Sequence, residues 1–451
     1  MTERRQGNHL VAVVGAGPAG LFAARKLASP DVHVIIFNRD IKPGGLAEYG
    51  IFPSKHKMKA GLRQQFNRIL EIPEIEYYGN VVIGLNGDFT LNELRAFGFQ
   101  AILVTVGAQG TKWLGLQGED LLGVYHAKDI VYHYNKLPPF SERKFTIGKH
   151  VAVVGVGNVM LDIAHWLIRE KKVDEVIAVA RRGPAEVKFS KKELEYIAAN
   201  MDLEDLDKEF ERVAPIMQSV GQDVDEAKEF IISAIPKAAE PVSSTNFRFE
   251  FLASPSRILG GERGEVRGLE VENTVLIQDD GDIKAKRLGA KRVIPVDTVI
   301  FCIGDRVDET FGLPVRWNEF VKNPDPDFPV NGLSYEAYNP DSARPIDRVF
   351  VSGWAREASS GLVGVARKDG EFGAQAVAQY LQTQPKLKDI DDMLFNLRQR
   401  VEHLDKTVIT KEDYRYLQQV ESEEADRLGL EEFKFATQEE MLAAIKKVVA
   451  D

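Results

Sequence analysis

An α/β fold with two nucleotide-binding domains is predicted by three observations in this sequence of 451 residues. Residues 10–27 and residues 150–164 each consist of a short apolar stretch, a glycine-rich loop and a helix-like segment. A second apolar stretch, rich in β-branched residues, follows each of them at 32–37 and at 176–180. A strand, a loop, a helix and a second strand in this order form a βαβ unit, whose strands pair in parallel. Two such units predict two parallel sheets.

The first glycine-rich loop has the spacing G-x-G-x-x-G, at Gly15, Gly17 and Gly20. In a Rossmann-type unit the first glycine permits a tight turn and the second lets a pyrophosphate approach the backbone. The third glycine brings the helix close to the strand, and the N–H groups at the start of that helix meet the phosphate. The end of the second strand, after Phe37, should meet the adenine-side ribose. This unit is predicted to hold a cofactor that contains ADP.

The second loop repeats the pattern at Gly155 and Gly157, with Met160 in the third glycine position. A methionine there implies a looser approach of helix to strand than in the first loop. The strand that follows ends in Arg181-Arg182. At this position of a Rossmann unit an acid favours NAD, whereas arginines pair with the 2′-phosphate of NADP. The arginine pair predicts NADP, and the alternative interpretation is two solvated surface charges.

Further motifs lie outside these two loops. The glycine-rich stretch 43–53 is predicted to wrap its backbone around the cofactor, with a plain surface loop as the alternative. The apolar strand 101–107 ends in a glycine that would let chain and cofactor touch. Ser190 and Glu193 have the spacing of a capping box, in which Glu193 closes back on the Ser190 backbone. A role for Glu193 near a nicotinamide is a second possibility that the capping box does not exclude.

The remaining segments are predicted to be structural. Residues 201–240 have a helical and heavily charged pattern, which we interpret as a solvated face or an insertion. Residues 246–277 show the alternation typical of strands. Cys302 lies within an apolar strand and is interpreted as a core residue. A helix is expected over 371–381, and the charge-dense stretch beyond residue 385 is expected to be helical and to serve packing or a partner surface.

Composition narrows the possible functions. The net charge is −10 at pH 7, which argues against nucleic acid and against an anionic membrane surface, because binding to phosphates needs clustered Lys and Arg. Cys302 is the only cysteine, so we expect no disulfide framework, no cysteine redox pair and no metal or iron–sulfur site. No apolar run reaches the length of a membrane span. We expect a cytoplasmic protein whose electrons leave through a bound cofactor.

The order of the motifs resembles flavin-dependent pyridine-nucleotide reductases, in which a second dinucleotide fold is inserted within the first. Four motifs narrow the resemblance to the adrenodoxin reductase family of ferredoxin–NADP reductases. They are Gly155-x-Gly157-Asn158-Val159-x-x-Asp162, Arg181-Arg182-Gly183-Pro184, Gly118-Glu119-Asp120, and Gly353-Trp354 with Gly361-x-x-Gly364. The likeness runs from about residue 10 to the C-terminus.

This resemblance implies three-layer ββα domains of the Rossmann type and an order of parts along the chain. Residues 1–109 would form the first part of a FAD-binding domain, and residues 110–305 an NADP-binding domain inserted into it. Residues 306–385 would form the second part of the FAD-binding domain. Residues 386–451 would form a charged helical C-terminal tail.

The resemblance also implies which residues bind the two cofactors. FAD would be bound by Gly15, Gly17, Pro18, Ala19, Asn38, Gly45, Leu46, Val82, Gly107, Trp354, Gly361, Leu362 and Val363. NADP(H) would be bound by Val156, Gly157, Asn158, Val159, Arg181, Arg182, Glu193 and Gly361. The candidates for a position near the nicotinamide are Lys55, His56 and Glu193. No side chain needs to act as a nucleophile, because the cofactors supply the chemistry.

Two of these positions depart from the family pattern. Asn38 stands where the family usually has a glutamate that holds both ribose hydroxyls. Either FAD binds less tightly, or another group assists. Lys55 stands at the place of a histidine, and His56 follows one position later. The proton-handling or docking role of that histidine is therefore open.

The implied activity is hydride transfer between NADPH and FAD, followed by single-electron transfer to a protein acceptor such as ferredoxin. The basic face expected to dock an acidic ferredoxin is thin and consists of Lys188, Lys191 and Lys192. Residues 44–51 look more like the small subunit of glutamate synthase, so an NADPH-oxidising subunit of a larger complex is an alternative. A non-catalytic flavoprotein that senses NADP is another. The acceptor, the direction of electron flow and the oligomeric state stay open.

Overall fold

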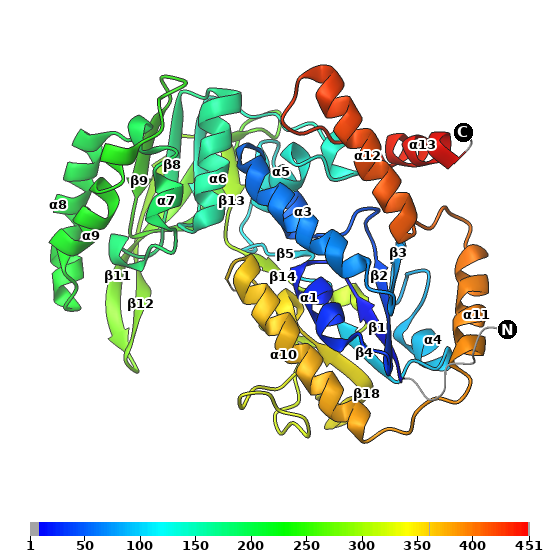
Figure 1. The fold of residues 1–451 in the computed structure, drawn as a ribbon. Coiled ribbons are helices and arrows are strands. Elements are labelled where there is room, and N and C mark those ends of the chain that lie inside the picture. Colours follow the sequence, from blue (N-terminus) through cyan, green and yellow to red (C-terminus); the bar gives the residue numbers. More distant parts are fainter. Residues whose placement is uncertain (1–8, 360, 450–451) are drawn as a thin grey trace. The chain divides into compact units, whose positions relative to one another are not determined.

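The computed structural model describes residues 9–359 and 361–449 (Figure 1). The chain divides into two compact units. Unit 1 comprises Met1–Thr111, Tyr132–Glu142 and Gly304–Asp451, and unit 2 comprises Lys112–Val131 and Arg143–Ile303. Each unit is built around its own parallel sheet, so the predicted α/β fold class is confirmed.

The sheet of unit 1 has six strands, in the order β17-β18-β4-β1-β2-β3. Their bounds are β1 (His9–Val14), β2 (Val32–Asn38), β3 (Ile75–Gly79), β4 (Ala101–Val104), β17 (Glu336–Asn339) and β18 (Arg344–Val351). All neighbours pair in parallel except β17, which is antiparallel to β18. The chain order reverses at β1, which lies between β2 and β4. Ligands of open parallel sheets bind beyond the carboxyl ends of the strands at such a reversal.

Helices cover both faces of this sheet. On one face α1 (Pro18–Leu27), α3 (His56–Leu70) and α10 (Val363–Gln382) share a hydrophobic core with β1. Helix α10 crosses α1 closely, as Figure 1 shows. Gly370 permits this approach, since an added Cβ would lie 2.2 Å from the carbonyl oxygen of Ala19. On the other face α4 (Leu91–Ala96) and α11 (Ile390–Glu402) pack on a second core.

The C-terminal segment is helical, as predicted, and belongs to unit 1. Helices α12 (Lys411–Leu428) and α13 (Gln438–Val449) place apolar side chains in the same core as β1. Gly79 at the end of β3 exchanges backbone hydrogen bonds of 2.7 and 3.0 Å with Ile409. The charge-dense tail is therefore a structural part of this unit and contributes to its core.

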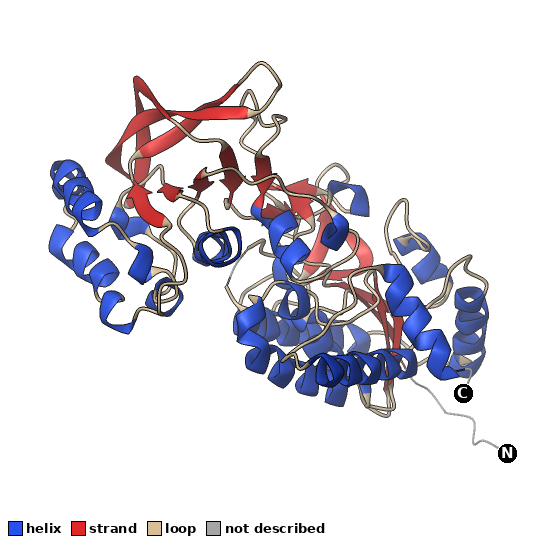
Figure 2. Ribbon diagram, turned by 90° about the horizontal axis from the view of Figure 1, so that it is seen from above, coloured by secondary structure: helices blue, strands red, loops and turns tan. Residues whose placement is uncertain are grey.

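The sheet of unit 2 has five parallel strands, in the order β6-β13-β7-β8-β9. They are β6 (Val124–His126), β7 (His150–Val154), β8 (Glu175–Val179), β9 (Asn246–Glu250) and β13 (Thr298–Phe301). An antiparallel sheet of β10 (Ala253–Gly260), β11 (Val266–Asp279) and β12 (Asp282–Ile294) packs on one face through a shared core. Helices α6 (Asn158–Trp166), α8 (Leu203–Ser219) and α9 (Val224–Ile232) lie on the other (Figure 2). This is the predicted three-layer arrangement.

Short elements complete the two units. They are β5 (Gly110–Thr111), β14 (Asp305–Arg306), β15 (Val315–Arg316), β16 (Glu319–Phe320), α2 (Leu46–Tyr49), α5 (Ala127–Tyr134) and α7 (Lys191–Leu194). None of the helices within residues 9–359 and 361–449 is both long and apolar enough to cross a membrane. In the same residues, no group of three or more His, Cys, Asp and Glu side chains could hold a metal ion.

Three structural expectations need correction. Cys302 lies just past the end of β13 and is half-buried, because the strand closes at Phe301. Helix α10 begins at Val363, eight residues before the expected start at Glu371, because its first turns pack on α1. The segment 201–240 does not only form a solvated face, since α8 buries a full apolar stripe. The strands predicted over 246–277 are present as β9, β10 and β11, and the sequence analysis did not extend to β12, whose side chains are mostly exposed.

Candidate functional site

The first glycine loop is fixed by its contacts with the strand beside it. Gly15 has a φ of +107°, and an added Cβ would lie 2.7 Å from the carbonyl oxygen of Thr105. A Cβ on Gly20 would lie 2.0 Å from the carbonyl oxygen of Gly15. The Thr105 hydroxyl is within hydrogen-bond distance of the carbonyl oxygens of Val14, at 3.0 Å, and Gly15, at 2.8 Å. Side chains are therefore excluded at both glycines, and the turn has one conformation.

The other side of this loop is open. Nothing lies within 4 Å of the position of a Cβ on Gly17. Helix α1 starts there with Pro18, and its first N–H groups have no partner within the helix. They carry the positive end of the helix dipole, so a phosphate fits at this point. Gly45 belongs to the same wall, because a Cβ on it would lie 3.1 Å from the Cα atom of Gly17.

Asn38, at the end of β2, turns its side chain toward this loop. Its Oδ1 accepts a hydrogen bond of 3.0 Å from the backbone N–H of Ala16. Its Nδ2 donates to the carbonyl oxygens of Asp40, at 2.8 Å, and Lys42, at 3.1 Å. A carboxylate could make the first contact but not the other two, because it has no N–H to donate. The amide in place of the usual acid therefore ties together two loops of unit 1.

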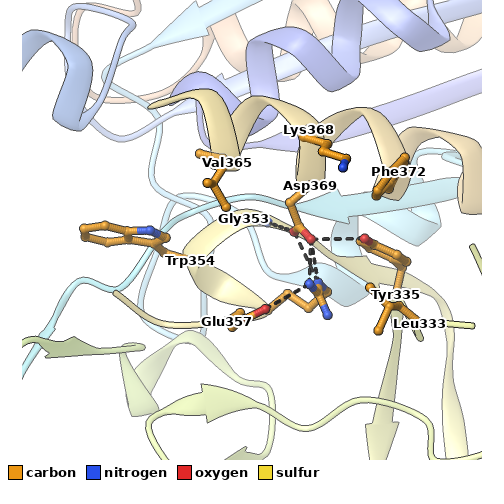
Figure 3. A pocket seen from close by; sticks show the side chains of 11 residues that line it. Leu333, Tyr335, Gly353, Trp354, Glu357, Val365, Lys368, Asp369 and Phe372 are labelled. Atoms are coloured by element: carbon orange, nitrogen blue, oxygen red, sulfur yellow. Dashed lines mark hydrogen bonds and ion pairs between the residues drawn. The ribbon is translucent and has the colours of Figure 1, made fainter. Parts of the chain in front are cut away.

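A second group of residues surrounds the Gly353-Trp354 turn, which follows β18 (Figure 3). The Asp369 carboxylate, on α10, accepts a hydrogen bond of 2.5 Å from the backbone N–H of Gly353. It also accepts from the Tyr335 hydroxyl at 3.0 Å and from Arg356 Nη2 at 2.6 Å. The turn is thereby fastened to α10 by a charged acceptor with several donors, the strong kind of hydrogen bond.

Apolar side chains stand exposed beside this turn. The Leu362 side chain is 70% exposed and Val365 is 51% exposed at the start of α10. Gly361 precedes them with a φ of +71°, where a side chain would be strained. Trp354 points away from the Asp369 carboxylate, and Trp354, Val365 and Asp369 border a hollow of about 190 Å³ (Figure 3). Such a surface suits a flat, largely apolar ring.

The other predicted contacts in unit 1 are more scattered. The backbone N–H of Val82 donates to Asp88 Oδ2 at 2.7 Å and is therefore engaged within the unit. His56 starts α3, and its Nε2 lies 3.4 Å from Glu431 Oε2 in the C-terminal segment. Lys55 closes the short turn before it. Leu46 and Gly107 lie where expected, at the start of α2 and just after β4, with a φ of +71° at Gly107.

Unit 2 contains the second loop between β7 and α6. Gly155 has a φ of +122°, and an added Cβ would lie 2.3 Å from the carbonyl oxygen of Cys302. Nothing lies within 4 Å of the position of a Cβ on Gly157, so this loop also has an open side. The Met160 side chain is fully buried in the hydrophobic interior. Helix and strand are thus held apart by a side chain here, where unit 1 has Gly20 in backbone contact.

Arg181 and Arg182 lie directly after β8 with their backbones held in place. The carbonyl oxygen of Arg181 accepts a hydrogen bond of 2.7 Å from the Thr274 hydroxyl, and that of Arg182 accepts one of 3.2 Å from the N–H of Leu252. Arg181 is exposed and Arg182 is half-buried. Within the described part of the chain, no ion pair engages either guanidinium. Two cations held without a counter-charge form a site for an anion.

The segment after the arginines folds back on the second loop. The N–H of Lys188 donates to the carbonyl oxygen of Val156 at 2.9 Å, and the N–H of Ser190 donates to Asn158 Oδ1 at 2.8 Å. The Ser190 hydroxyl accepts from the N–H of Glu193 at 3.3 Å. The N–H that the capping-box prediction assigned to Glu193 is therefore taken by Asn158. This brings the Val156–Val159 loop, Glu193 and the arginine segment together, whereas Gly361 belongs to unit 1.

Residues 9–206 match the family described as Pyridine nucleotide-disulphide oxidoreductase. The chain is 29% identical over 401 residues to NADPH-ferredoxin reductase FprA of Mycobacterium leprae, a match that covers 80% of this chain and 82% of that protein. It is 28% identical over 406 residues to the mitochondrial NADPH:adrenodoxin oxidoreductase of Salvelinus fontinalis, covering 82% and 77%. Over about four fifths of its length, the chain is therefore similar to members of the adrenodoxin reductase family. The resemblance read from the motifs is confirmed, and the protein is an oxidoreductase, as expected.

A solved structure has the same fold as this chain. Mycobacterium tuberculosis FprA in complex with NADPH has a TM-score of 0.79, and the match covers 97% of this chain and 99% of that one. The sequence identity is 24%, so this likeness concerns the fold alone. Two groups that build the site were missed in the sequence. Thr105 could have been suspected from its place at the end of an apolar strand, but nothing local marks Asp369.

Proposed function

We propose that this relative of the adrenodoxin reductase family moves hydride between NADPH and FAD and passes single electrons to a ferredoxin-like protein. The observation that carries the proposal is the pair Arg181 and Arg182, held by backbone contacts beside an open glycine loop. The names of the relatives, which include NADPH-ferredoxin reductase and NADPH:adrenodoxin oxidoreductase, support the same reaction.

Unit 1 is the proposed FAD site. Its first loop fits a pyrophosphate because Gly17 is open and the helix end is unpartnered. The half-buried Trp354 and the exposed side chains of Leu362 and Val365 fit the isoalloxazine ring. Bound FAD would supply the chemistry, since it takes up a hydride and gives up electrons one at a time. The chain's own part is to orient the ring, and Asp369 does this through the backbone of Gly353.

Unit 2 is the proposed NADP site. The Val156–Val159 loop would receive the pyrophosphate, and the two guanidinium groups would bind the 2′-phosphate through charge-assisted hydrogen bonds. NADH has a hydroxyl at that position and gains nothing from a second positive charge. The arginines therefore discriminate between the two nucleotides. Lys55, His56 and Glu193 stay the candidates for contact with the nicotinamide.

An anaerobic absorbance titration tests the proposal. The purified holoprotein should show a flavin spectrum that bleaches on addition of NADPH at about one equivalent per flavin, and much less readily with NADH. A colourless protein that cannot be reconstituted with FAD would refute the flavin assignment. Equal bleaching by both nucleotides would refute the assignment of the arginine pair.

The electron acceptor is proposed to be a small acidic protein that docks on Lys188, Lys191 and Lys192. The rival proposal is a fixed partner enzyme, which the likeness of residues 44–51 to a glutamate synthase subunit favours. A stoichiometric second chain that co-purifies would support the rival. Reduction of an artificial acceptor by the chain alone distinguishes both from a non-catalytic NADP sensor, which would give none.

We also propose that the protein acts in the cytoplasm. A reducing compartment suits a chain with one cysteine and no disulfide framework. Fractionation of cells that express the full chain at its natural level would test this. Recovery in an organelle or in the membrane fraction would contradict it.

A further inference from the structure

A buried charge cluster joins the glycine-rich stretch of unit 1 to its C-terminal segment. Its side chains are at most 22% exposed, and most are nearly inaccessible. The cluster consists of the cations Lys42, Lys59, Arg63 and Lys434 and the anions Glu48, Glu421 and Glu432. Charged side chains are rarely buried unless each has a partner, because desolvation is costly. Such a cluster therefore points to a specific role.

Glu48 is the centre of this buried charge cluster. Arg63 donates to its two carboxylate oxygens from Nε and Nη2, each at 2.6 Å. Lys434 Nζ lies 2.8 Å and Lys42 Nζ lies 3.4 Å from Oε1. Burial raises the pKa of Glu48, but the positive charges of Lys42, Lys434 and Arg63 lower it by more. The carboxylate is therefore ionised and anchored by three cations.

Glu48 is also in contact with the proposed flavin loop. Its Cβ lies 2.9 Å from where a Cβ of Gly44 would be, so the two residues are packed against each other. The N–H of Gly44 donates to the carbonyl oxygen of Ala16 at 2.7 Å, and Gly45 lies against Gly17. A continuous set of contacts thus runs from the carboxylate to the phosphate loop. A shift of Glu48 would move both glycines.

The C-terminal segment completes the cluster. Lys434 donates to the backbone oxygen of Glu48 at 2.8 Å as well as to its carboxylate. Glu432 binds Lys59 at 2.8 Å and also Arg63, and Glu421 lies 2.5 Å from Lys42. Removal of this segment would leave three cations of the glycine-rich side without these carboxylates, and an uncompensated buried charge is strongly destabilising. The tail therefore holds the flavin loop in place.

We propose that Glu48 and Lys434 are positioning residues for FAD, and that residues 421–436 act as a clamp that keeps the flavin loop closed on the phosphate loop. This inference rests on the proposed function, because it assumes that unit 1 binds FAD. The direction in which FAD affinity changes on loss of the Glu48 charge distinguishes a positional role from a purely electrostatic one. If the cluster acted only through its charge, loss of the Glu48 anion would favour the anionic cofactor. If Glu48 acts by position, the same loss weakens binding.

The test compares the FAD dissociation constants of Glu48→Gln and of a matched control, Glu76→Gln. Glu76 is another multiply bonded carboxylate of unit 1, contacted by His33, Tyr78 and Arg398, but it lies on β3 and outside the flavin loop. We expect Glu48→Gln to raise the dissociation constant at least tenfold and to change the visible circular dichroism of the bound flavin. Glu76→Gln should leave both within twofold.

Several results would overturn the clamp. Tighter FAD binding in Glu48→Gln would show that the cluster acts through charge, and equal behaviour of the two variants would show general destabilisation. If Glu48→Gln does not fold, Lys434→Met provides the same comparison from the other side, with loss of FAD expected and unchanged binding contradicting it. A wild-type protein that binds no FAD would instead refute the proposed function, so the two failures are distinguishable.

Discussion

The two glycine loops share a motif but are held in different ways. In unit 1 Gly20 lies against the backbone of the loop, Asn38 accepts a hydrogen bond from the loop, and Gly45 packs on its other side. In unit 2 Met160 replaces the third glycine, and the nearby cations Arg181 and Arg182 have no counter-charge in the described chain. A loop held by contacts on several sides suits a cofactor that stays bound. A loop beside two cations without a counter-charge suits one that exchanges.

Under the proposed function, this difference lets one motif serve both a resident and a diffusing nucleotide. Binding energy in unit 1 would come from a preformed shape, which lowers the entropy cost of holding the ligand. In unit 2 it would come from charge-assisted contacts at the surface, which would distinguish one nucleotide from another. The predictions below test each side of the comparison, beginning with the largest effect.

Replacing Gly20 by alanine should abolish FAD binding. The new Cβ would lie 2.0 Å from the carbonyl oxygen of Gly15, so α1 would have to move away from the strand. Overpacking of this kind costs about 3 kcal/mol of folding free energy. The flavin content of the purified protein measures the effect. The counterpart Met160→Ala should lower the melting temperature but keep NADPH binding, and equal loss of both nucleotides would break the comparison.

The double variant Arg181→Ala with Arg182→Ala should raise the KM for NADPH by at least about 100-fold, because hydrogen bonds to charged groups contribute about 1.5 to 3 kcal/mol each. The KM for NADH should stay nearly unchanged. Steady-state kinetics with an artificial acceptor measures both. Arg267→Ala is the control, since this arginine of unit 2 is exposed and paired with Glu265. A similar rise with both nucleotides would mean that the arginines do not contact the 2′-phosphate.

Asp369→Asn should lower kcat about tenfold, equivalent to about 1.4 kcal/mol, with little change in the KM for NADPH. The amide accepts fewer hydrogen bonds than the carboxylate and loosens the Gly353-Trp354 turn at the proposed ring. Glu371→Gln on the same helix is the control, because that carboxylate pairs with Arg25 and Arg367 at the surface. A changed KM for NADPH with an unchanged kcat would show that Asp369 does not act on the flavin ring.

The smallest expected effect is on stability at acid pH. It concerns unit 1, because Glu76 belongs to that unit. Burial raises the pKa of Glu76, but hydrogen bonds from His33 and Arg398 bring it from 4.5 to about 2. A depressed pKa contributes stability above pH 4.5 that is lost as the pH falls toward 2. Glu76→Gln should therefore make the free energy of unfolding of unit 1 less dependent on pH in that range. A curve that keeps the wild-type slope would assign the acid sensitivity to other carboxylates.

Much of the fold could be predicted from the sequence, because βαβ units carry local signals. The central strands of both parallel sheets, such as β1, β4, β7 and β13, are largely apolar runs, and Gly15 and Gly155 mark turns with positive φ. The predictions were wrong or incomplete where tertiary packing, and not the local residue pattern, determines the structure. β12 is exposed at most positions and carries several charges, so it has no continuous buried face to detect. Helix α8 hides a buried stripe beneath many acidic residues.

The predicted site was incomplete for a related reason. Asn38 was predicted to bind FAD, and only the structure shows that its amide also binds the backbone of two loops, a role that depends on where Ala16 and Lys42 fold. Asp369 sits within an ordinary helical stretch, and only the tertiary structure brings it to Gly353. The function of each residue followed from its neighbours in space.

The sequence alone determined the two predicted nucleotide-binding units, their glycine loops and the arginine pair. Each is encoded within about 30 residues by hydrophobic periodicity and by the spacing of glycines. Only the tertiary structure decided which groups hold those loops. Glu48 and Lys434 are 386 positions apart, and their pairing depends on a core that forms from the whole of unit 1. Contacts at such separations leave no period in the sequence, since each partner is a single charged residue among many.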